Sequence, residues 1–140
     1  MNAEFYISTE KSKLNISRIH QEVKNSYWGD YRTMEMTKST IENSICFGVY
    51  SKTNEQVGFA RVLTDKFVLA YIMDVLIFDA HKGKGLGKML IEYILNHPII
   101  KNVQTIALKT KDAHGLYEPY GFNRIGDSSM WMAKDRAKYN

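Results

Sequence analysis

Cysteine and proline are scarce in this chain. Among its 140 residues there are one cysteine, Cys46, and two prolines. A single thiol excludes an internal disulfide framework and a metal site built from several cysteines. Because Cys46 lies in the apolar segment ICFGVY, we interpret it as a buried, unreactive thiol. The four histidines are dispersed and form no H-x3-H pair, so we expect no metal site.

Long apolar runs are absent as well. No segment reaches the length of about 18 apolar residues that a membrane-spanning helix needs. The first residues, MNAEFYISTEKSK, lack the apolar core of a signal peptide. We therefore expect a cytoplasmic protein without a membrane partner.

The charge of the chain is only mildly one-sided. The formal net charge is +4 and the pI is about 9.1. Lysines gather near a glycine-rich loop and in the tail AKDRAKYN, which suits a small polyanionic ligand as well as a nucleic acid. A nucleic-acid binder is a minor alternative that predicts steep salt dependence. We expect no nucleic-acid partner.

The apolar patterns predict a single domain over residues 1–140 with a mixed α/β fold. Three strand-like segments joined by short turns, 46–51, 56–65 and 67–78, predict antiparallel pairing. A helix ending near His97 and a strand over 103–110 then predict a crossover, with parallel pairing to 71–77. Further strands are expected at 4–9, from Phe122 and over 129–133, and further helices over 13–26 (capped by Ser12), after a Thr37 cap and from Ala113.

The segment 71–97 has the arrangement of an anion site. A strand-like apolar run is followed by a loop and then by apolar residues at helical spacing. Glycines let backbone N–H groups turn toward a ligand, and the helix adds free N–H donors and the positive end of its dipole. The loop holds three glycines and three lysines: Gly83, Gly85, Gly87, Lys82, Lys84 and Lys88. The predicted ligand is a phosphate or pyrophosphate.

The glycine spacing narrows the choice of ligand. The G-x-G-x-G pattern differs from the G-x-G-x-x-G of dinucleotide-binding folds, and the Gly-Lys-Ser/Thr ending of nucleotide hydrolases is absent. A glycine-rich turn that only caps the helix is the structural alternative.

Two motifs together resemble the GNAT N-acetyltransferase superfamily. The segment Lys82-Gly83-Lys84-Gly85-Leu86-Gly87 resembles the family signature Arg/Gln-x-x-Gly-x-Gly/Ala. After one more predicted strand, KTKDAHGLYEPYGF resembles Asn-x-x-Ala-x-x-x-Tyr-x-x-x-Gly-Phe, with Thr110 in place of the common asparagine and Pro119 in place of a common lysine. The matching residues are Ala113, Leu116, Tyr117, Glu118, Gly121 and Phe122. The early strands and helices also fit the family's order, so the resemblance covers the whole chain.

The resemblance implies a fold and a co-substrate. The fold would be a mixed, mainly antiparallel central sheet of six to seven strands flanked by about four helices, with the central strands splayed around acetyl-CoA. Acetyl-CoA would be the co-substrate, and no metal would be needed. Its expected contacts are the strand backbone, the glycine loop and one tyrosine: Val75, Leu76, Ile77, Lys82, Gly83, Lys84, Gly85, Leu86, Gly87, Lys88 and Tyr117.

The same resemblance makes Tyr117 the expected general acid. In the family this tyrosine lies beside the coenzyme sulfur. When an amine attacks the thioester, the leaving group is a thiolate, and a thiol pKa of about 8.5 allows a nearby phenol to donate its proton. The structural alternative is a tyrosine that packs a short helix onto the sheet.

Asp74 is a second catalytic candidate, because the expected base is missing. Some family members use a glutamate on the strand before the glycine loop, and the corresponding positions here are Tyr71 and Met73. Asp74 is the carboxylate in the apolar centre of that strand, although strand alternation would turn it away from both positions. Alternatively it is a structural aspartate bound to a neighbouring loop or to Arg61, because an unpaired buried carboxylate costs several kcal/mol.

The predicted reaction transfers an acetyl group from acetyl-CoA to an amine, on a small molecule or a protein, by direct attack in a ternary complex. A monomer or homodimer is expected. The candidates for the acceptor pocket are Trp28, Tyr31, Arg32 and Arg61, and exposed arginines there would indicate an acidic acceptor. The alternative function is a non-catalytic CoA-binding sensor or interaction module on the same fold.

Overall fold

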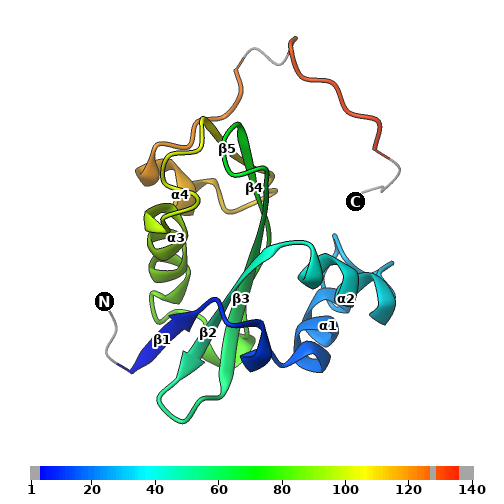
Figure 1. Cartoon of the computed structure of the whole chain (residues 1–140), viewed down its shortest axis with the longest axis vertical. Coiled ribbons are helices and arrows are strands. Elements are labelled where there is room, and N and C mark those ends of the chain that lie inside the picture. Colours follow the sequence, from blue (N-terminus) through cyan, green and yellow to red (C-terminus); the bar gives the residue numbers. More distant parts are fainter. Residues whose placement is uncertain (1–3, 127–128, 136–140) are drawn as a thin grey trace.

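A five-stranded sheet forms the centre of the protein (Figure 1). The computed structural model describes residues 4–126 and 129–135. The strand order follows the sequence: β1 (Phe5–Ser8), β2 (Ile45–Ser51), β3 (Gln56–Thr64), β4 (Leu69–Ile77) and β5 (Thr105–Leu108). Neighbours are antiparallel except β4 and β5, which are parallel. The predicted mixed sheet and its parallel crossover are therefore confirmed.

The predicted number of six to seven strands is wrong for the part of the chain that the structure describes. The two predicted strands that do not form are those from Phe122 and over 129–133, where residues 122–126 and 129–133 have no strand pairing. Met130 and Met132 are 91% and 95% exposed. High β-propensity reflects how well a side chain packs on a half-buried, pleated sheet surface. The Met130 and Met132 side chains are almost fully exposed and gain no such packing.

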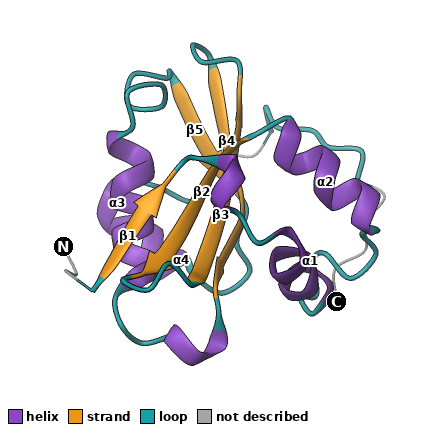
Figure 2. Cartoon of the chain, turned by 60° about the horizontal axis from the view of Figure 1, so that its bottom comes forward, coloured by secondary structure: helices purple, strands orange, loops and turns teal. Residues whose placement is uncertain are grey.

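Four α-helices cover the two faces of the sheet (Figure 2). On one face lie α1 (Ile16–Lys24) and α2 (Met34–Glu42), and on the other lies α3 (Leu86–Asn96), with the short α4 (His114–Tyr117) beside it. Three 3-10 turns complete the described elements: Lys11–Lys13, Asp79–His81 and Glu118–Tyr120.

The first two helices begin at other residues than predicted. Asn15, not Ser12, caps α1, since its side chain accepts a hydrogen bond from the Arg18 N–H. Thr33, not Thr37, caps α2 by accepting from the Met36 N–H.

Thr37 instead lies inside α2, where its hydroxyl is 2.7 Å from His20 Nδ1 on α1. It is buried, so this hydrogen bond ties the two helices together. A threonine usually favours a cap over a helix interior, but here a partner on α1 holds Thr37 inside the helix, and the sequence alone therefore placed the start of α2 too late.

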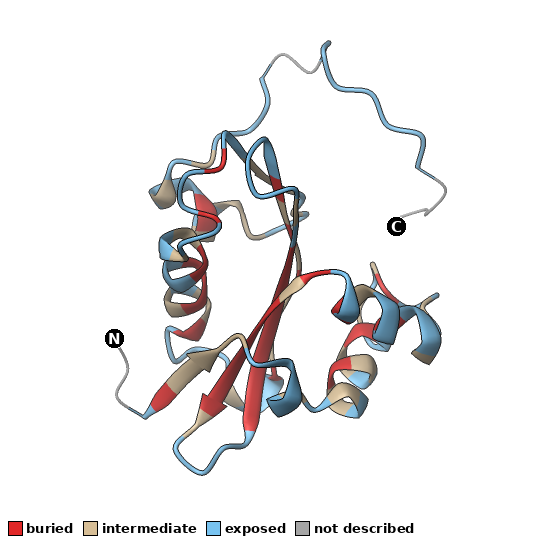
Figure 3. Cartoon of the chain, in the orientation of Figure 1, coloured by how far each residue is buried: buried red, intermediate tan, exposed pale blue. Residues whose placement is uncertain are grey.

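Each face of the sheet has its own apolar core, and burial is concentrated along β2 to β4 and the inner side of α3 (Figure 3). The larger core lies under α3 and contains Phe47, Val62, Ile72, Leu90 and Ile94. The smaller core lies under α1 and α2 and contains Ile19, Val23, Ile41, Cys46 and Phe59. Burial raises the pKa of the Cys46 thiol to about 11, which confirms a buried thiol that stays protonated at neutral pH.

A β-bulge interrupts β4 at Asp74. Opposite β3, Met73 pairs with Arg61 and Leu76 pairs with Phe59, so two residues of β4 face one residue of β3. Asp74 has a φ of 54°, in the left-handed region that residues other than glycine seldom adopt.

The bulge changes the face that each later side chain of β4 joins. Ile72 packs in the core under α3, and uninterrupted alternation would send Asp74 to the same side. Instead Asp74 contacts Arg61, as Met73 does, while Val75 packs against the core under α3. The prediction that alternation turns Asp74 away from Met73 is therefore wrong, because the bulge inserts one extra residue.

Candidate active site

The strands β4 and β5 separate beyond Ile72. Their parallel ladder pairs 69–72 with 105–108 and ends there. The Phe78 N–H donates to Val57 O on β3 at 2.9 Å. Because consecutive residues of a strand direct their N–H groups to opposite sides, the N–H groups of Val75 and Ile77 point into the gap, whereas that of Leu76 points toward β3.

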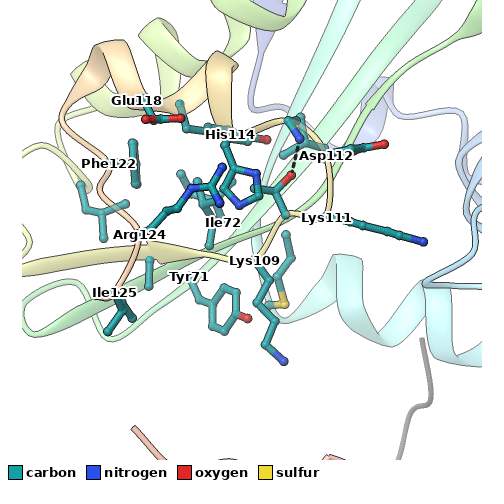
Figure 4. Close-up of a pocket in the computed structure, with 18 of the residues that line it drawn as sticks. Tyr71, Ile72, Lys109, Lys111, Asp112, His114, Glu118, Phe122, Arg124 and Ile125 are labelled. Atoms are coloured by element: carbon teal, nitrogen blue, oxygen red, sulfur yellow. Dashed lines mark hydrogen bonds between the residues drawn. The ribbon is translucent and has the colours of Figure 1, made fainter. Parts of the chain in front are cut away.

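A cleft of about 1160 Å³ occupies this gap. Its walls come from β4, β5, the segment after β5, α4 and the loop between α1 and α2, and Figure 4 shows many of its side chains. Five predicted site residues line it: Trp28, Arg32, Asp74, Val75 and Tyr117. The other predicted site residues do not line this cleft: Tyr31, Arg61, Leu76, Ile77 and the loop 82–88.

Tyr117 brings a phenol hydroxyl to the cleft. It ends α4, is 7% exposed, and its ring meets Phe122 edge-on at 5.9 Å. Its hydroxyl has no hydrogen-bond partner within residues 4–126 and 129–135. Burial raises the pKa of the phenol, so the proton stays on Tyr117 at neutral pH and is available to a ligand in the cleft.

Local structure holds α4 in place. The Thr110 hydroxyl accepts a hydrogen bond from the Ala113 N–H at 3.0 Å and so fixes the turn that enters α4. Thr110 occupies the position where the family motif commonly has asparagine. On α3, a Cβ built on Gly87 would lie 3.6 Å from the Leu116 side chain. The glycine motif and the tyrosine motif are therefore packed directly against each other.

The glycine loop has the backbone geometry of an anion cradle. Gly83 and Gly85 have φ values of 81° and 78°, and Gly85 is the N-cap of α3. The first hydrogen bond of α3 runs from the Met89 N–H to Gly85 O, so the N–H groups of residues 86–88 have no partner inside the helix. Lys82 pairs with Asp79 at 2.8 Å, and the other two lysines of the loop are exposed.

Asp74 is the centre of a buried ion cluster. Its Oδ2 accepts hydrogen bonds from Arg61 Nε at 2.7 Å and from Arg32 Nη1 at 2.5 Å. Side-chain exposure is 5% for Asp74, 7% for Arg61 and 11% for Arg32. Arg61 also donates to Ser44 Oγ at 3.2 Å, which holds it behind Asp74 and away from the cleft. Asp74 thus has the structural contact with Arg61 that was the alternative to a catalytic role.

Arg32 brings the cluster to the wall of the cleft. Its guanidinium carbon lies 5.3 Å from the centre of the Trp28 ring. Burial alone would lower the pKa of Arg32, but the hydrogen bonds and charges of Asp74 and, to a lesser extent, Tyr31 outweigh it, and the pKa is raised. Of the four predicted acceptor residues, Trp28 and Arg32 face the cleft, Arg61 is buried, and Tyr31 is 55% exposed outside it.

Sequence reasoning missed three basic residues of the cleft, Lys109, Lys111 and Arg124. Figure 4 shows them with Tyr71 and His114 around the same opening. The first two follow β5 directly, and residues just past the carboxyl end of a parallel strand commonly line ligand clefts. That rule, applied to the segment KTK after the predicted strand 103–110, could have found them.

Residues 42–124 match a family model described as an acetyltransferase (GNAT) domain. The chain belongs to the GNAT family. It superimposes with a TM-score of 0.91 on a protein of Xanthomonas campestris pv. campestris assigned to the GNAT acetyltransferases, at 32% identity over 96% of this chain and 95% of the other. An uncharacterised N-acetyltransferase of Pyropia yezoensis is 29% identical over 134 residues, which are 92% of this chain and 76% of that relative.

A more distant likeness concerns the fold. The spermidine N-acetyltransferase of Vibrio cholerae, solved with CoA and spermine, has a TM-score of 0.69 at 19% identity over 86% of this chain and 81% of that one. The family-model match confirms the predicted family, and the Vibrio cholerae protein of the same fold binds CoA. In the part of the chain that the structure describes, no helix is long and apolar enough to cross a membrane, and no three potential metal ligands gather.

Proposed function

We propose that this GNAT protein transfers an acetyl group from acetyl-CoA to an amine by direct attack in a ternary complex. The observation that carries the proposal is the Tyr117 hydroxyl, which has no hydrogen-bond partner among the described residues and lines the same cleft as Val75, whose N–H we infer to face the gap between β4 and β5. A proton donor and a backbone N–H donor on one cleft suit a thioester whose sulfur leaves while its carbonyl oxygen gains charge.

The residues present fit acetyl-CoA. The loop 82–85 and the first residues of α3, with positive-φ glycines and N–H groups that have no partner inside the helix, would hold the pyrophosphate. The backbone of Val75 and Ile77, which lacks a β5 partner, would hydrogen-bond the pantetheine arm. Bound there, acetyl-CoA supplies the activated acetyl group.

The chain's own part in the reaction is then positioning and proton donation. Val75 N–H would stabilise the oxyanion that forms when the amine attacks the carbonyl carbon. Tyr117 would give its proton to the sulfur as the C–S bond breaks and the C–N bond forms. Tyr71 and Met73 hold the positions of the family's glutamate, so we expect the ammonium proton to leave through water.

A screen of amines for thiol release from acetyl-CoA tests this function. We expect turnover with at least one amine, and a kcat for Tyr117→Phe that is about 10²- to 10⁴-fold lower with unchanged acetyl-CoA affinity. Full activity of Tyr117→Phe would remove the acid role. Micromolar CoA binding without turnover of any amine would instead identify a CoA-binding sensor.

A further inference from the structure

We propose that the acceptor is a small amine bearing an anionic group, a carboxylate or a phosphate, and that Arg32 binds this group. The inference rests on the proposed acetyl transfer and specifies its substrate class. It starts from the ion cluster of Arg32, Asp74 and Arg61, in which two guanidinium groups share one carboxylate oxygen.

The cluster carries an excess positive charge. One carboxylate neutralises one guanidinium group, and all three side chains are at most 11% exposed. A buried charge without a counter-ion is costly, so the cluster is stabilised by a further anion. Arg61 is directed inward to Ser44, so the excess charge is accessible at Arg32, on the wall of the cleft.

Arg32 is held in a fixed orientation for binding. Asp74 Oδ2 accepts a hydrogen bond from Arg32 Nη1, and the guanidinium carbon lies 5.3 Å from the centre of the Trp28 ring. A guanidinium group has five N–H donors arranged as a planar fork that matches a carboxylate or a phosphate. Because Asp74 and Trp28 already fix the orientation of the Arg32 guanidinium group, Arg32 loses less side-chain entropy when a ligand binds.

The rest of the cleft favours the same ligand charge. Its basic lining residues are Arg32, Lys109, Lys111 and Arg124, and its acidic ones are Asp74, Asp112 and Glu118. Arg61 neutralises Asp74 from behind and Lys109 pairs with Asp135, so the remaining basic residues, Arg32, Lys111 and Arg124, still outnumber Asp112 and Glu118. Arg124 extends from the segment after α4 toward His114 in the same opening (Figure 4). An excess of positive charge in the cleft attracts an anion and repels a polycation.

The distance between the two binding groups limits the length of the acceptor. Asp74, which holds Arg32, is the direct neighbour of Val75, whose N–H points to the reacting carbonyl in the proposed mechanism, and consecutive Cα atoms are about 3.8 Å apart. Because only the short Asp74 side chain separates the Arg32 guanidinium group from the strand that carries the Val75 N–H, the anionic group and the attacking nitrogen should fit on one small molecule. Amino acids and aminoalkyl phosphates meet this condition.

Matched amine pairs test the inference. Glycine is compared with glycinamide, β-alanine with its amide, and phosphoethanolamine with ethanolamine, with spermidine as a polycation. The kcat/KM of each is measured by thiol release at equal free-base concentration. Binding to the CoA-saturated protein is measured by calorimetry. We expect the anionic member of at least one pair to be favoured about 10- to 100-fold, the effect of one charged hydrogen-bonding site. The pair that responds distinguishes carboxylate from phosphate.

Three variants locate the effect. Arg32→Gln should abolish the preference by raising KM, with unchanged CoA affinity. It should fold, because Asp74 keeps Arg61 as its partner. Arg32→Lys should restore part of the preference, since the charge returns without the fork. Arg18→Gln, the control, removes the same charge from an α1 residue that pairs with Glu22 outside the cleft, and should keep the full preference.

Each outcome decides the matter. Equal rates within every pair, a preference for spermidine, or a full preference in Arg32→Gln would overturn the inference while leaving acetyl transfer intact. Binding of an anionic amine that Arg32→Gln loses, without turnover, would support the anion site and contradict the proposed catalysis. Neither binding nor turnover of any amine would overturn both.

Discussion

The proposed site has an acetyl-CoA side and an acceptor side, which are built from different chemical groups. On the acetyl-CoA side, the glycine loop and the open edge of β4 offer mainly backbone N–H groups. On the acceptor side, the cluster of Arg32, Asp74 and Arg61 offers side-chain charge. Backbone donors suit a ligand that many proteins share, whereas side-chain charges are easily exchanged and so select one acceptor over another.

The largest effect should come from removing the carboxylate of the acceptor side. Asp74→Ala leaves two guanidinium groups buried without their shared counter-ion, and should lower the free energy of unfolding by about 3–5 kcal/mol in urea titrations. Asp79→Ala, which removes an exposed carboxylate paired with Lys82, is the control and should unfold as the wild type does. Equal stability of the two variants would mean that the cluster is not a structural unit.

A smaller effect is expected from the backbone of the acetyl-CoA side. Gly85→Ala forces a left-handed conformation on alanine, at a cost of roughly 1–2 kcal/mol, and should weaken acetyl-CoA binding because the loop relaxes. A Cβ added at either Gly85 or Gly115 would meet no atom within 4 Å, so neither substitution causes a clash. The two glycines differ in that Gly85 has a positive φ and Gly115 does not. Gly115→Ala therefore isolates the effect of φ and should keep full affinity. If both variants bind acetyl-CoA equally well, the left-handed turn is not needed.

The smallest effect should follow from a lysine of the loop. Lys82 is exposed and already paired with Asp79, so Lys82→Gln should weaken acetyl-CoA binding by no more than about fivefold in calorimetry. If Lys82→Gln lost as much acetyl-CoA affinity as Gly85→Ala, side-chain charge would contribute as much as backbone geometry on the acetyl-CoA side. The contrast between the two sides would then be wrong.

The local structure of the proposed acetyl-CoA side was predictable because its signals are local in sequence. Positive-φ glycines, the helix after them and the tyrosine on α4 all lie within short motifs, and the order of elements from β2 to α4 followed from apolar periodicity. The number of strands was overestimated at Phe122, which is only partly buried against the core, and at 129–133, where Met130 and Met132 are exposed.

The acceptor side was predictable only in part. Arg32 and Arg61 lie 42 and 13 residues from Asp74, and only the folded chain shows that both reach it. The bulge that turns Asp74 toward them has no glycine to mark it. Arg61 was therefore expected at the acceptor, although it is buried behind Asp74.

The pH dependence of kcat tests the role of Tyr117 most directly. Burial raises the pKa of this phenol above its ordinary value of about 10, so the acid form should persist through neutral pH and be lost only above that value. At saturating amine and acetyl-CoA, kcat of the wild type should rise as the amine loses its proton and fall above pH 10 or so. Tyr117→Phe should be slower and lack the alkaline fall. An identical fall in both proteins would contradict proton donation by Tyr117.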